Sequence, residues 1–282
     1  MVRTVVSGIC GRTGMLVAAQ LATAEGVKLV GGVEAPGHDT VGTKLADILG
    51  QSELPGRVVG ALSDLDPDAF DVLVDFSVPE QSALCAEFSA AAGTGLVVAT
   101  TGLTETQTGK VRAASSRVAV VLASNTSVGA NVLFALLERA GAALDEDFDI
   151  EIVEAHHRGK RDAPSGTALT AADILARARG RSSDTVVVAG RSGLSVGRKR
   201  GEIGVHSVRG GSIAGRHTIR FLSGLETLAL EHVALSREAF AVGAVRAARF
   251  AAVSGPGLYD MLDVLGLREA ADNDGSEGNT GP

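Results

Sequence analysis

Aromatic side chains are scarce, since they make up 3% of this 282-residue sequence and tryptophan is absent. Valine, alanine and leucine must therefore fill the core, and an apolar content of 45% is sufficient for a sizeable one. Cysteine is equally rare. Cys10 and Cys85 are too few for a disulfide framework or a thiolate zinc site, so we expect no metal centre and a reducing, cytoplasmic location.

Two further absences concern partners. With a formal net charge of -7, the chain lacks the basic surface that non-specific nucleic-acid binding requires. The sequence also lacks any run of about 18 apolar residues and the charged and apolar regions of a signal peptide. We therefore expect neither a nucleic acid nor a membrane among the partners.

The first half of the sequence alternates strand-like and helix-like segments. Short apolar runs predict strands over residues 3–8, 27–33, 72–77, 96–102 and 118–123. Helices are expected over residues 15–24, 79–92 and 104–116. Continuous apolar strands alternating with helices are typical of a parallel sheet covered on both faces. The predicted fold class is α/β, with a Rossmann-like domain first.

A glycine-rich turn follows the first strand. Gly8, Gly11 and Gly14 have the spacing G-x-x-G-x-x-G, close to the dinucleotide fingerprint, in which a tight turn brings the backbone to a pyrophosphate at a helix start. The second strand ends in Glu34, about twenty residues on, where a carboxylate binds a ribose hydroxyl. No cation follows Glu34 directly, which favours NADH over NADPH. Arg12 could still bind a 2′-phosphate, so NADPH stays allowed.

Polar residues follow the other strands of this half. Because ligands of parallel sheets collect beyond the carboxyl ends of the strands, these residues predict one shared crevice on the nucleotide side. They are Ser77, Thr100, Thr101 and Asn125, together with Gly8 and Glu34.

Residues 154–168 carry the densest chemistry of the chain. A strand predicted over residues 149–154 delivers His156 and His157 to its carboxyl edge, and Lys160 follows. Ser165 or Thr167 can cap the next helix, whose free N–H groups bind a carboxylate or phosphate. This arrangement predicts a small acidic substrate held by Lys160 and the helix start, with a histidine beside it.

The second half predicts a different architecture. After a helix at residues 132–144, strands are expected over residues 203–208, 217–221 and 226–231, in a mixed, largely open sheet that could associate in an oligomer. Arg209, Arg216 and Arg237 could face the crevice, although a surface position is the default interpretation. We place a dinucleotide-binding domain at 1–126, a substrate-binding and oligomerisation domain at 127–237, C-terminal helices that pack back on the first domain at 238–267, and a disordered tail at 268–282.

The stretch Glu-Ala-His-His-Arg-Gly-Lys-Arg-Asp-Ala-Pro-Ser-Gly-Thr-Ala at 154–168 closely resembles the signature of the 4-hydroxy-tetrahydrodipicolinate reductase family, also called dihydrodipicolinate reductases. Residues 8–14, 34, 75–77, 100–102, 125–129 and 237–243 follow the family pattern in order. The resemblance implies that His156 is the proton donor, a role also assigned to Lys160. It also implies the remaining contacts: His157, Ser165, Gly166 and Thr167 for substrate, and Gly8, Ile9, Cys10, Gly11, Arg12, Thr13, Glu34, Ala99, Thr100, Thr101, Ala123, Ser124, Asn125 and Thr126 for the dinucleotide.

The implied reaction is the reduction of a cyclic imine that bears two carboxylates, by a homotetramer in the diaminopimelate and lysine pathway. Hydride goes to C4, and an imidazole is a suitable proton donor near neutral pH. The family usually has other residues where Thr13, Ala99 and Thr126 stand. These departures leave open a paralogous reductase of a different cyclic imine, and a non-catalytic nucleotide-binding protein is a further alternative.

Overall fold

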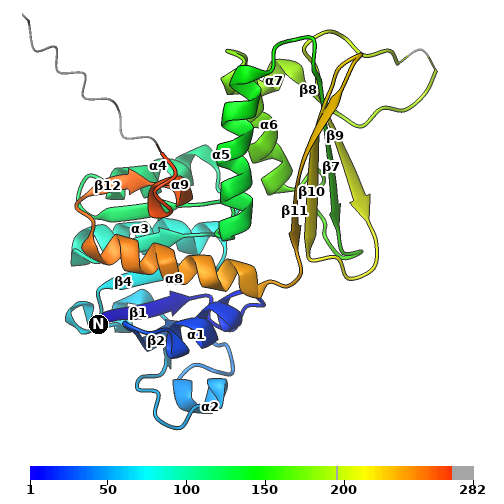
Figure 1. The fold of residues 1–282 in the computed structure, drawn as a ribbon. Coiled ribbons are helices and arrows are strands. Elements are labelled where there is room, and N and C mark those ends of the chain that lie inside the picture. Colours follow the sequence, from blue (N-terminus) through cyan, green and yellow to red (C-terminus); the bar gives the residue numbers. More distant parts are fainter. Residues whose placement is uncertain (195, 269–282) are drawn as a thin grey trace, which may run out of the picture.

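The computed structural model describes residues 1–194 and 196–268, and their strands form two sheets (Figure 1). The larger sheet has the strand order β12-β6-β5-β4-β1-β2-β3, and all its strands pair in parallel. Its strands are β1 (Val2–Ser7), β2 (Val27–Val33), β3 (Val58–Val59), β4 (Val72–Asp75), β5 (Gly95–Val98), β6 (Ala119–Leu122) and β12 (Gly257–Tyr259).

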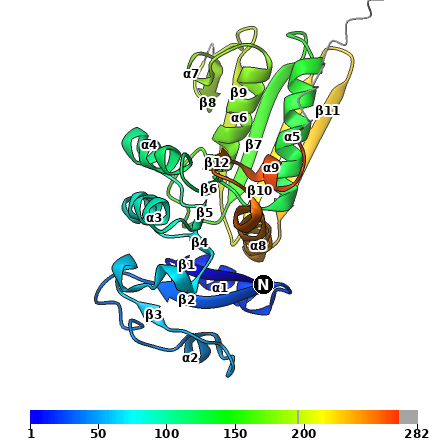
Figure 2. The same ribbon diagram turned by 90° about the vertical axis from the view of Figure 1, so that its left-hand side faces the viewer.

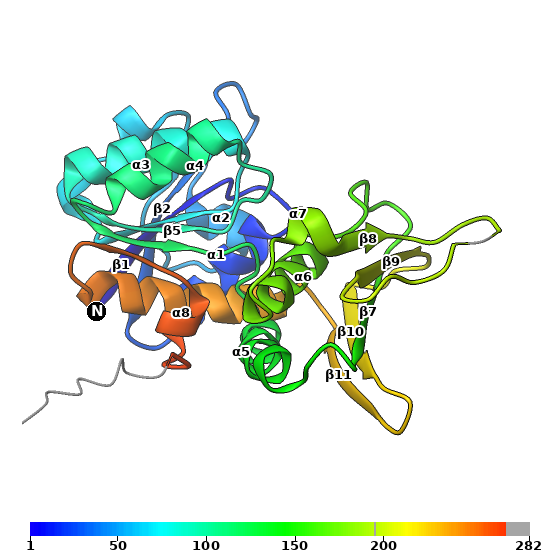
Figure 3. The same ribbon diagram turned by 90° about the horizontal axis from the view of Figure 1, so that it is seen from above.

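Helices cover both faces of this sheet (Figure 3). On one face lie α1 (Gly14–Thr23) and α8 (Glu238–Val253), and on the other lie α3 (Pro79–Ala92) and α4 (Glu105–Ala114). The strands are buried on both sides because their residues are apolar without alternation, as in Val72–Asp75 with its four buried residues. A short helix, α2 (Leu45–Leu49), and two 3-10 turns (Leu62–Asp64 and Pro67–Ala69) lie in the connections around β3.

The second sheet has the order β11-β10-β7-β9-β8 and mixes parallel with antiparallel pairs (Figure 2). Its strands are β7 (Asp149–His156), β8 (Val187–Ala189), β9 (Ile203–Arg209), β10 (Gly215–Leu222) and β11 (Thr227–Ala234). The helices α5 (Val128–Ala143) and α6 (Gly166–Ala178) pack on one face and form a separate core with residues such as Ile152 and Phe221. The predicted class, a Rossmann-like parallel sheet plus an α+β domain with a mixed sheet, is therefore confirmed.

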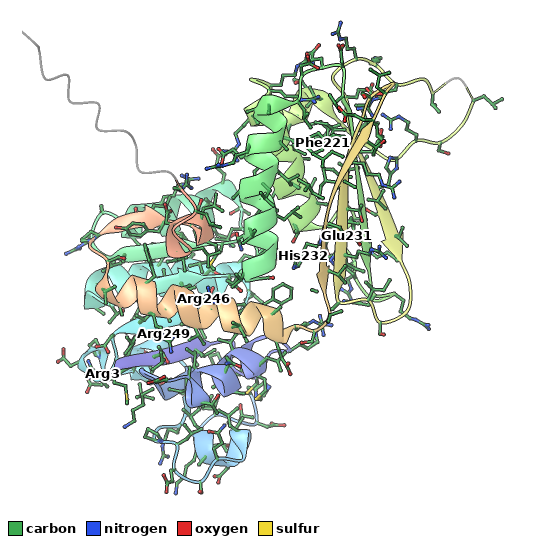
Figure 4. The ribbon with its side chains drawn as sticks, viewed as in Figure 1. Arg3, Phe221, Glu231, His232, Arg246 and Arg249 are labelled. Carbon is green, nitrogen blue, oxygen red and sulfur yellow. The ribbon has the colours of Figure 1, made fainter. Side chains whose placement is uncertain are left out.

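The other face of the second sheet is not covered by a helix of the described residues (Figure 4). It carries every second side chain of the strands, such as Arg216 and Val233, which are cross-strand neighbours. His232, on the inner face, shares a hydrogen bond with the Ser127 hydroxyl at the start of α5 (3.4 Å). The sheet is thus anchored to α5 on one side only.

The chain passes between the two sheets twice, between β6 and α5 and between β11 and α8. The two connecting segments lie side by side, as shown by the hydrogen bond that the Thr126 hydroxyl donates to the carbonyl oxygen of Phe240 (2.8 Å). Gly243 makes this contact sterically possible, since a Cβ there would lie 1.6 Å from the carbonyl oxygen of Thr126. Asn131 supports the first passage by donating to the carbonyl oxygens of Asn125 and Ser127 (2.8 Å each).

Several short elements were not predicted from the sequence. They are α2, β3, α7 (Ser183–Val186), β8 and β12, while α9 (Met261–Val264) lies within the C-terminal helices predicted at 238–267. The structure also extends α5 four residues toward its N-terminus relative to the prediction. Residues 269–282, which make up nearly all of the predicted tail, lie outside the described residues.

Candidate active site

The glycine turn has the geometry of a phosphate cradle. Gly8 has a φ of +74°, and a Cβ there would lie 2.7 Å from the carbonyl oxygen of Phe76. A Cβ on Gly14 would lie 2.0 Å from the carbonyl oxygen of Gly8. Helix α1 begins at Gly14, and its N-cap residue Thr13 makes no side-chain capping bond. The N–H of Met15 donates to the carbonyl oxygen of Gly11 (3.0 Å), whereas those of Gly14 and Leu16 have no partner among the described residues and are available to a phosphate, so this turn fits a dinucleotide.

Glu34 stands beside this turn at the end of β2. Its carboxylate accepts hydrogen bonds from the backbone N–H of Cys10 (3.0 Å) and of Ala35 (3.0 Å). In the loop that follows, Thr40 shares hydrogen bonds with the Cys10 thiol (3.1 Å) and with Nδ1 of His38 (2.9 Å). The structure thus brings Glu34 against the glycine turn, in the position predicted for a ribose contact.

A buried carboxylate organises the next part of the crevice. Asp75 ends β4 and accepts hydrogen bonds from the hydroxyls of Ser77, Ser82 (2.5 Å) and Thr100 (2.8 Å). Burial raises the pKa of Asp75, and these three hydroxyls oppose that effect. The Thr100 hydroxyl also accepts from the backbone N–H of Ser77 (3.0 Å). The hydroxyl hydrogen of Thr100 is thus used inside the protein, whereas Thr101 is exposed.

The residues after β6 connect this crevice to the second domain. The Ser124 hydroxyl shares a hydrogen bond with that of Thr170 on α6 (3.2 Å), and Asn125 donates from Nδ2 to the Thr167 hydroxyl (3.1 Å). Ala123 is buried just before them. The structure therefore joins the predicted cofactor residues 123–126 to the start of α6, the predicted substrate site.

The start of α6 offers free backbone donors. Ser165 is the N-cap residue, since its hydroxyl accepts from the N–H of Ala168 (3.2 Å), which decides between the two predicted caps. The same hydroxyl shares a hydrogen bond with Nε2 of His217 (3.1 Å), a ring whose pKa burial lowers to about 4. Among the described residues, the N–H groups of Gly166 and Thr167 have no hydrogen-bond partner. Together they can bind one carboxylate.

Strand β7 brings His156 toward the same place. Its residues alternate between the core and the outer face, so Glu154 and His156 both point inward. Nδ1 of His156 lies 2.6 Å from a carboxylate oxygen of Glu154. Burial lowers the pKa of His156, the nearby charges of Lys160 and Arg209 add to this, and Glu154 opposes it.

Cations surround His157 at the mouth of the site. Nη2 of Arg237 lies 3.3 Å from Nε2 of His157, and Lys160 pairs with Asp162 (2.9 Å). Reduced hydration lowers the pKa of His157, and the charges of Arg237, Arg12 and Lys160 lower it further. Since Arg12 belongs to the glycine turn, the histidine stretch and the nucleotide turn face each other. A cavity of about 520 Å³ lies here, lined by Leu16, His157, Arg158, Gly211, Ser212, Ala214, Leu235, Ser236, Arg237 and Glu238.

Three groups of this site were not among the predicted site residues. The default surface interpretation is wrong for Arg209, which donates to both carboxylate oxygens of Glu154 (2.8 and 2.7 Å). Arg237 contacts His157, and Asp75 organises the crevice from beneath. Glu154 occupies an inward position of a predicted strand, and a buried carboxylate requires a partner, so this signal could have revealed Arg209 or an equivalent cation.

Two findings concern the site and the chain as a whole. Across residues 1–194 and 196–268, no group of three or more histidine, cysteine, aspartate or glutamate side chains is arranged to hold a metal ion. Within the same residues, no helix has the length and apolar character that a membrane span requires. The cytoplasmic location remains a prediction.

Solved structures share this two-domain fold. The chain superimposes on a dipicolinate-bound dihydrodipicolinate reductase from Paenisporosarcina sp. TG-14 with a TM-score of 0.71 at 23% identity, covering 93% of this chain and 98% of that one. A probable dehydrogenase from Thermotoga maritima gives a TM-score of 0.61 at 12% identity, over 94% and 93% of the two chains. These likenesses show the fold, a Rossmann-like domain joined to an α+β domain.

Sequence comparison specifies the family. The family models described as dihydrodipicolinate reductase, N-terminus and C-terminus, match residues 2–126 and 129–265. The chain is 46% identical to a 4-hydroxy-tetrahydrodipicolinate reductase from Anaeromyxobacter sp. (strain Fw109-5), over 96% of this chain and all of that protein. It is 42% identical to the reductase of that name from Methanothermobacter thermautotrophicus, over 95% of this chain. The chain belongs to the dihydrodipicolinate reductase family.

Proposed function

We propose that this protein catalyses the NAD(P)H-dependent reduction of 4-hydroxy-tetrahydrodipicolinate to tetrahydrodipicolinate in diaminopimelate and lysine biosynthesis. The observation that carries the proposal is the convergence of two groups of residues. His156, Lys160 and the free N–H groups at the start of α6 come from one segment of the second domain, and His157 of that segment lines the same cavity as Leu16 in the first turn of α1. The relatives at 46% and 42% identity carry the name of this activity.

The residues of the second domain fit a substrate with two carboxylates. The free N–H groups of Gly166 and Thr167 bind one carboxylate, and Lys160 and Arg237 offer positive charge to the other. Lys160 can leave Asp162 for the substrate, because that pair lies at the mouth of the site, where the Asp162 side chain is 58% exposed. The substrate is thereby oriented by both its ends.

His156 supplies the proton that completes the reaction. The 4-hydroxyl of the substrate must leave as water, which creates a double bond between C4 and the neighbouring carbon, in conjugation with the imine. When bound, the reduced nicotinamide would supply a hydride to C4, and the neighbouring carbon would then accept a proton. Burial and the cations of the site lower the pKa of His156, so its ring is mainly neutral before substrate binds at neutral pH. A dicarboxylate bound beside the ring neutralises those cations and raises the pKa of His156. Substrate binding therefore favours the protonated donor.

For the cofactor we propose NADH as the preferred form. Glu34 accepts two backbone hydrogen bonds and is directly followed by Ala35, so no cation stands beside the ribose position in sequence. A carboxylate favours a free 2′-hydroxyl and opposes a 2′-phosphate. The charge of Arg12 lowers the pKa of His157, so we expect the Arg12 guanidinium to lie on the substrate side of the site and not at the ribose. NADPH remains the alternative.

We also propose a homotetramer in which the uncovered faces of the second sheet associate. That face carries both apolar and charged side chains, such as Val153, Val233 and Arg220, which alternate with the inward-facing core residues. Light scattering coupled to size exclusion measures the mass of the assembly directly. A mass near that of one 28.6 kDa chain at micromolar concentration would reject the tetramer.

The function is tested by following cofactor oxidation with freshly generated 4-hydroxy-tetrahydrodipicolinate. His156→Gln should lower turnover by roughly 10² to 10⁴ fold, as expected for a lost general acid, and leave nucleotide binding unchanged. His206→Gln is the matched control, because His206 lies on the outer face of β9, where it contacts Glu151 (2.7 Å). Nucleotide binding without turnover in the wild type would instead support a non-catalytic protein, and turnover only with another cyclic imine would support a paralogue.

A further inference from the structure

Glu154 links the proposed proton donor to the proposed carboxylate site. One carboxylate oxygen lies 2.6 Å from Nδ1 of His156, and the other accepts the backbone N–H of Ser165 (3.1 Å) at the start of α6. The side chain of Glu154 is fully buried. A single carboxylate thus holds the imidazole and the helix start in fixed relation.

The charge of Glu154 is also fixed. Arg209, at the end of the neighbouring strand β9, donates to both of its oxygens (2.8 and 2.7 Å) and also to the carbonyl oxygen of Asp162. Burial by itself raises the pKa of Glu154, but the hydrogen bonds from Arg209, Ser207 and His156 outweigh it and bring the pKa to about 2. The carboxylate is therefore ionised throughout the physiological pH range.

An ionised carboxylate can only accept hydrogen bonds, so the atom facing it must carry hydrogen. Nδ1 of His156 is consequently protonated, which leaves Nε2 to exchange a proton with a ligand. Gly215 on β10 gives Nε2 its space, because a Cβ at that position would lie 3.2 Å from this nitrogen. The side chain of His156 is 10% exposed, so the imidazole is largely enclosed by the protein.

We propose that Glu154, clamped by Arg209, is a positioning residue that selects the Nδ1–H form of His156 and sets the distance between the proton donor and the carboxylate-binding start of α6. The proposal rests on the function proposed above and adds residues that act on the donor from behind. Neither Glu154 nor Arg209 touches substrate in this arrangement. Both act through His156 and through the backbone of Ser165.

Other charged and titratable groups also face His156. Lys160 lies on the loop after β7, Arg209 on β9, and His217 on β10 stacks edge to face against the imidazole with ring centroids 5.2 Å apart. His217 is neutral at pH 7, since its pKa is about 4, and the two cations disfavour the imidazolium. Among these neighbours, Glu154 is the anion that favours a protonated His156. Its removal should lower the pKa of His156.

The first test is the hydrogen position itself. Neutron crystallography of the deuterium-exchanged wild type at pD 8 should show deuterium on Nδ1 of His156 and none on Nε2. The measurement needs no turnover, so it is independent of the proposed reaction. Deuterium on Nε2 alone would overturn the proposal even if the protein reduces the expected substrate.

The second test is Glu154→Gln. Its amide can donate to Nδ1 as well as accept from it, so the ring is no longer held in one form. We expect kcat to fall by roughly 10² to 10⁴ fold, as for other histidines that lose an orienting carboxylate, with an unchanged Kd for NADH. Because the protonated ring is the active form, activity falls as pH rises through its pKa. The lowered pKa in Glu154→Gln therefore moves the alkaline limb of the kcat profile to lower pH.

Glu151→Gln is the matched control. Glu151 lies on the same strand but on the outer face, where it contacts Arg191 (2.8 Å), Arg198 and Nε2 of His206 (2.7 Å), so its surroundings have the same chemistry. With an assembly mass that matches the wild type by light scattering, we expect its kcat and its alkaline limb to match the wild type as well. A folded Glu154→Gln protein with kcat within twofold of the wild type and an unmoved alkaline limb would overturn the positioning role. An inactive wild type with deuterium on Nδ1 would reject the proposed reaction alone.

Discussion

Arg209→Met isolates the buried ion pair beneath the active site. The hydrogen bonds from Arg209 make the largest contribution to lowering the pKa of Glu154, which is about 2 whereas the usual value is 4.5. That difference corresponds to about 3 kcal/mol of stability at neutral pH. Because the folded pKa is depressed, the contribution is fully present above pH 4.5 and is lost as the pH falls toward 2. Removing one partner of a buried pair costs about 3 to 5 kcal/mol, in agreement with this estimate.

We therefore expect the free energy of unfolding of Arg209→Met to be lower by about 3 kcal/mol at pH 7. Without the guanidinium, burial dominates and raises the pKa of Glu154, so the variant recovers stability relative to the wild type as the pH falls from 7 to 4. Urea denaturation followed by circular dichroism at both pH values, at one fixed protein concentration, measures both effects.

Arg177→Met provides the control for Arg209→Met. Arg177 pairs with Asp173 on the surface of α6, with side chains 67% and 47% exposed, and such pairs contribute about 0.5 kcal/mol or less. Equal, small losses of unfolding free energy in the two variants at pH 7 would contradict a buried ion pair between Arg209 and Glu154. A difference in unfolding free energy between the wild type and Arg209→Met that grew as the pH fell would contradict it as well.

Three further predictions concern the nucleotide side. Glu34→Ala should weaken NADH binding by roughly tenfold, as for one lost hydrogen bond to a charged group, and an unchanged Kd by calorimetry would place the ribose elsewhere. Gly14→Ala puts a Cβ 2.0 Å from a backbone oxygen of the turn and should abolish NADH binding, whereas Gly109→Ala, in open space on α4, should bind normally. Thr100→Val removes a hydrogen-bond donor from the buried Asp75 carboxylate and should lower the free energy of unfolding by about 1 to 3 kcal/mol. The melting temperature should fall accordingly, and an unchanged melting temperature would contradict this stabilising role of Thr100.

The first sheet was largely predictable because its signals are local. Uninterrupted apolar runs between helical segments indicate buried parallel strands, and Pro79–Ala92 has the bounds expected from the sequence. The strand β12 was not predictable in this way. Its three residues follow Gly255 and Pro256, which suggest a turn, and they become a strand only by pairing with β6, far earlier in the chain.

The candidate site was predictable where chemistry is contiguous in sequence. His156, Lys160 and the start of α6 lie within a dozen residues, so a single segment revealed them. Arg209 could not be assigned, since its role depends on the parallel pairing that sets it opposite His156 on the neighbouring strand. The hydrogen bond from the Thr100 hydroxyl likewise could not be assigned, since its acceptor, Asp75, lies at the end of another strand. Contacts between strands require tertiary structure that local patterns do not encode.

The placement of α8 and β12 has a consequence for synthesis on the ribosome. The core of the first domain includes Ala244, Ala248 and other residues of α8, and the edge next to β6 is occupied by β12. When residue 126 leaves the exit tunnel, the part of one sheet face that α8 covers and the edge at β6 are therefore still exposed, although α1 is already present on that face. The intervening domain must be translated before they are covered, so the half of the molecule that is made first is completed last.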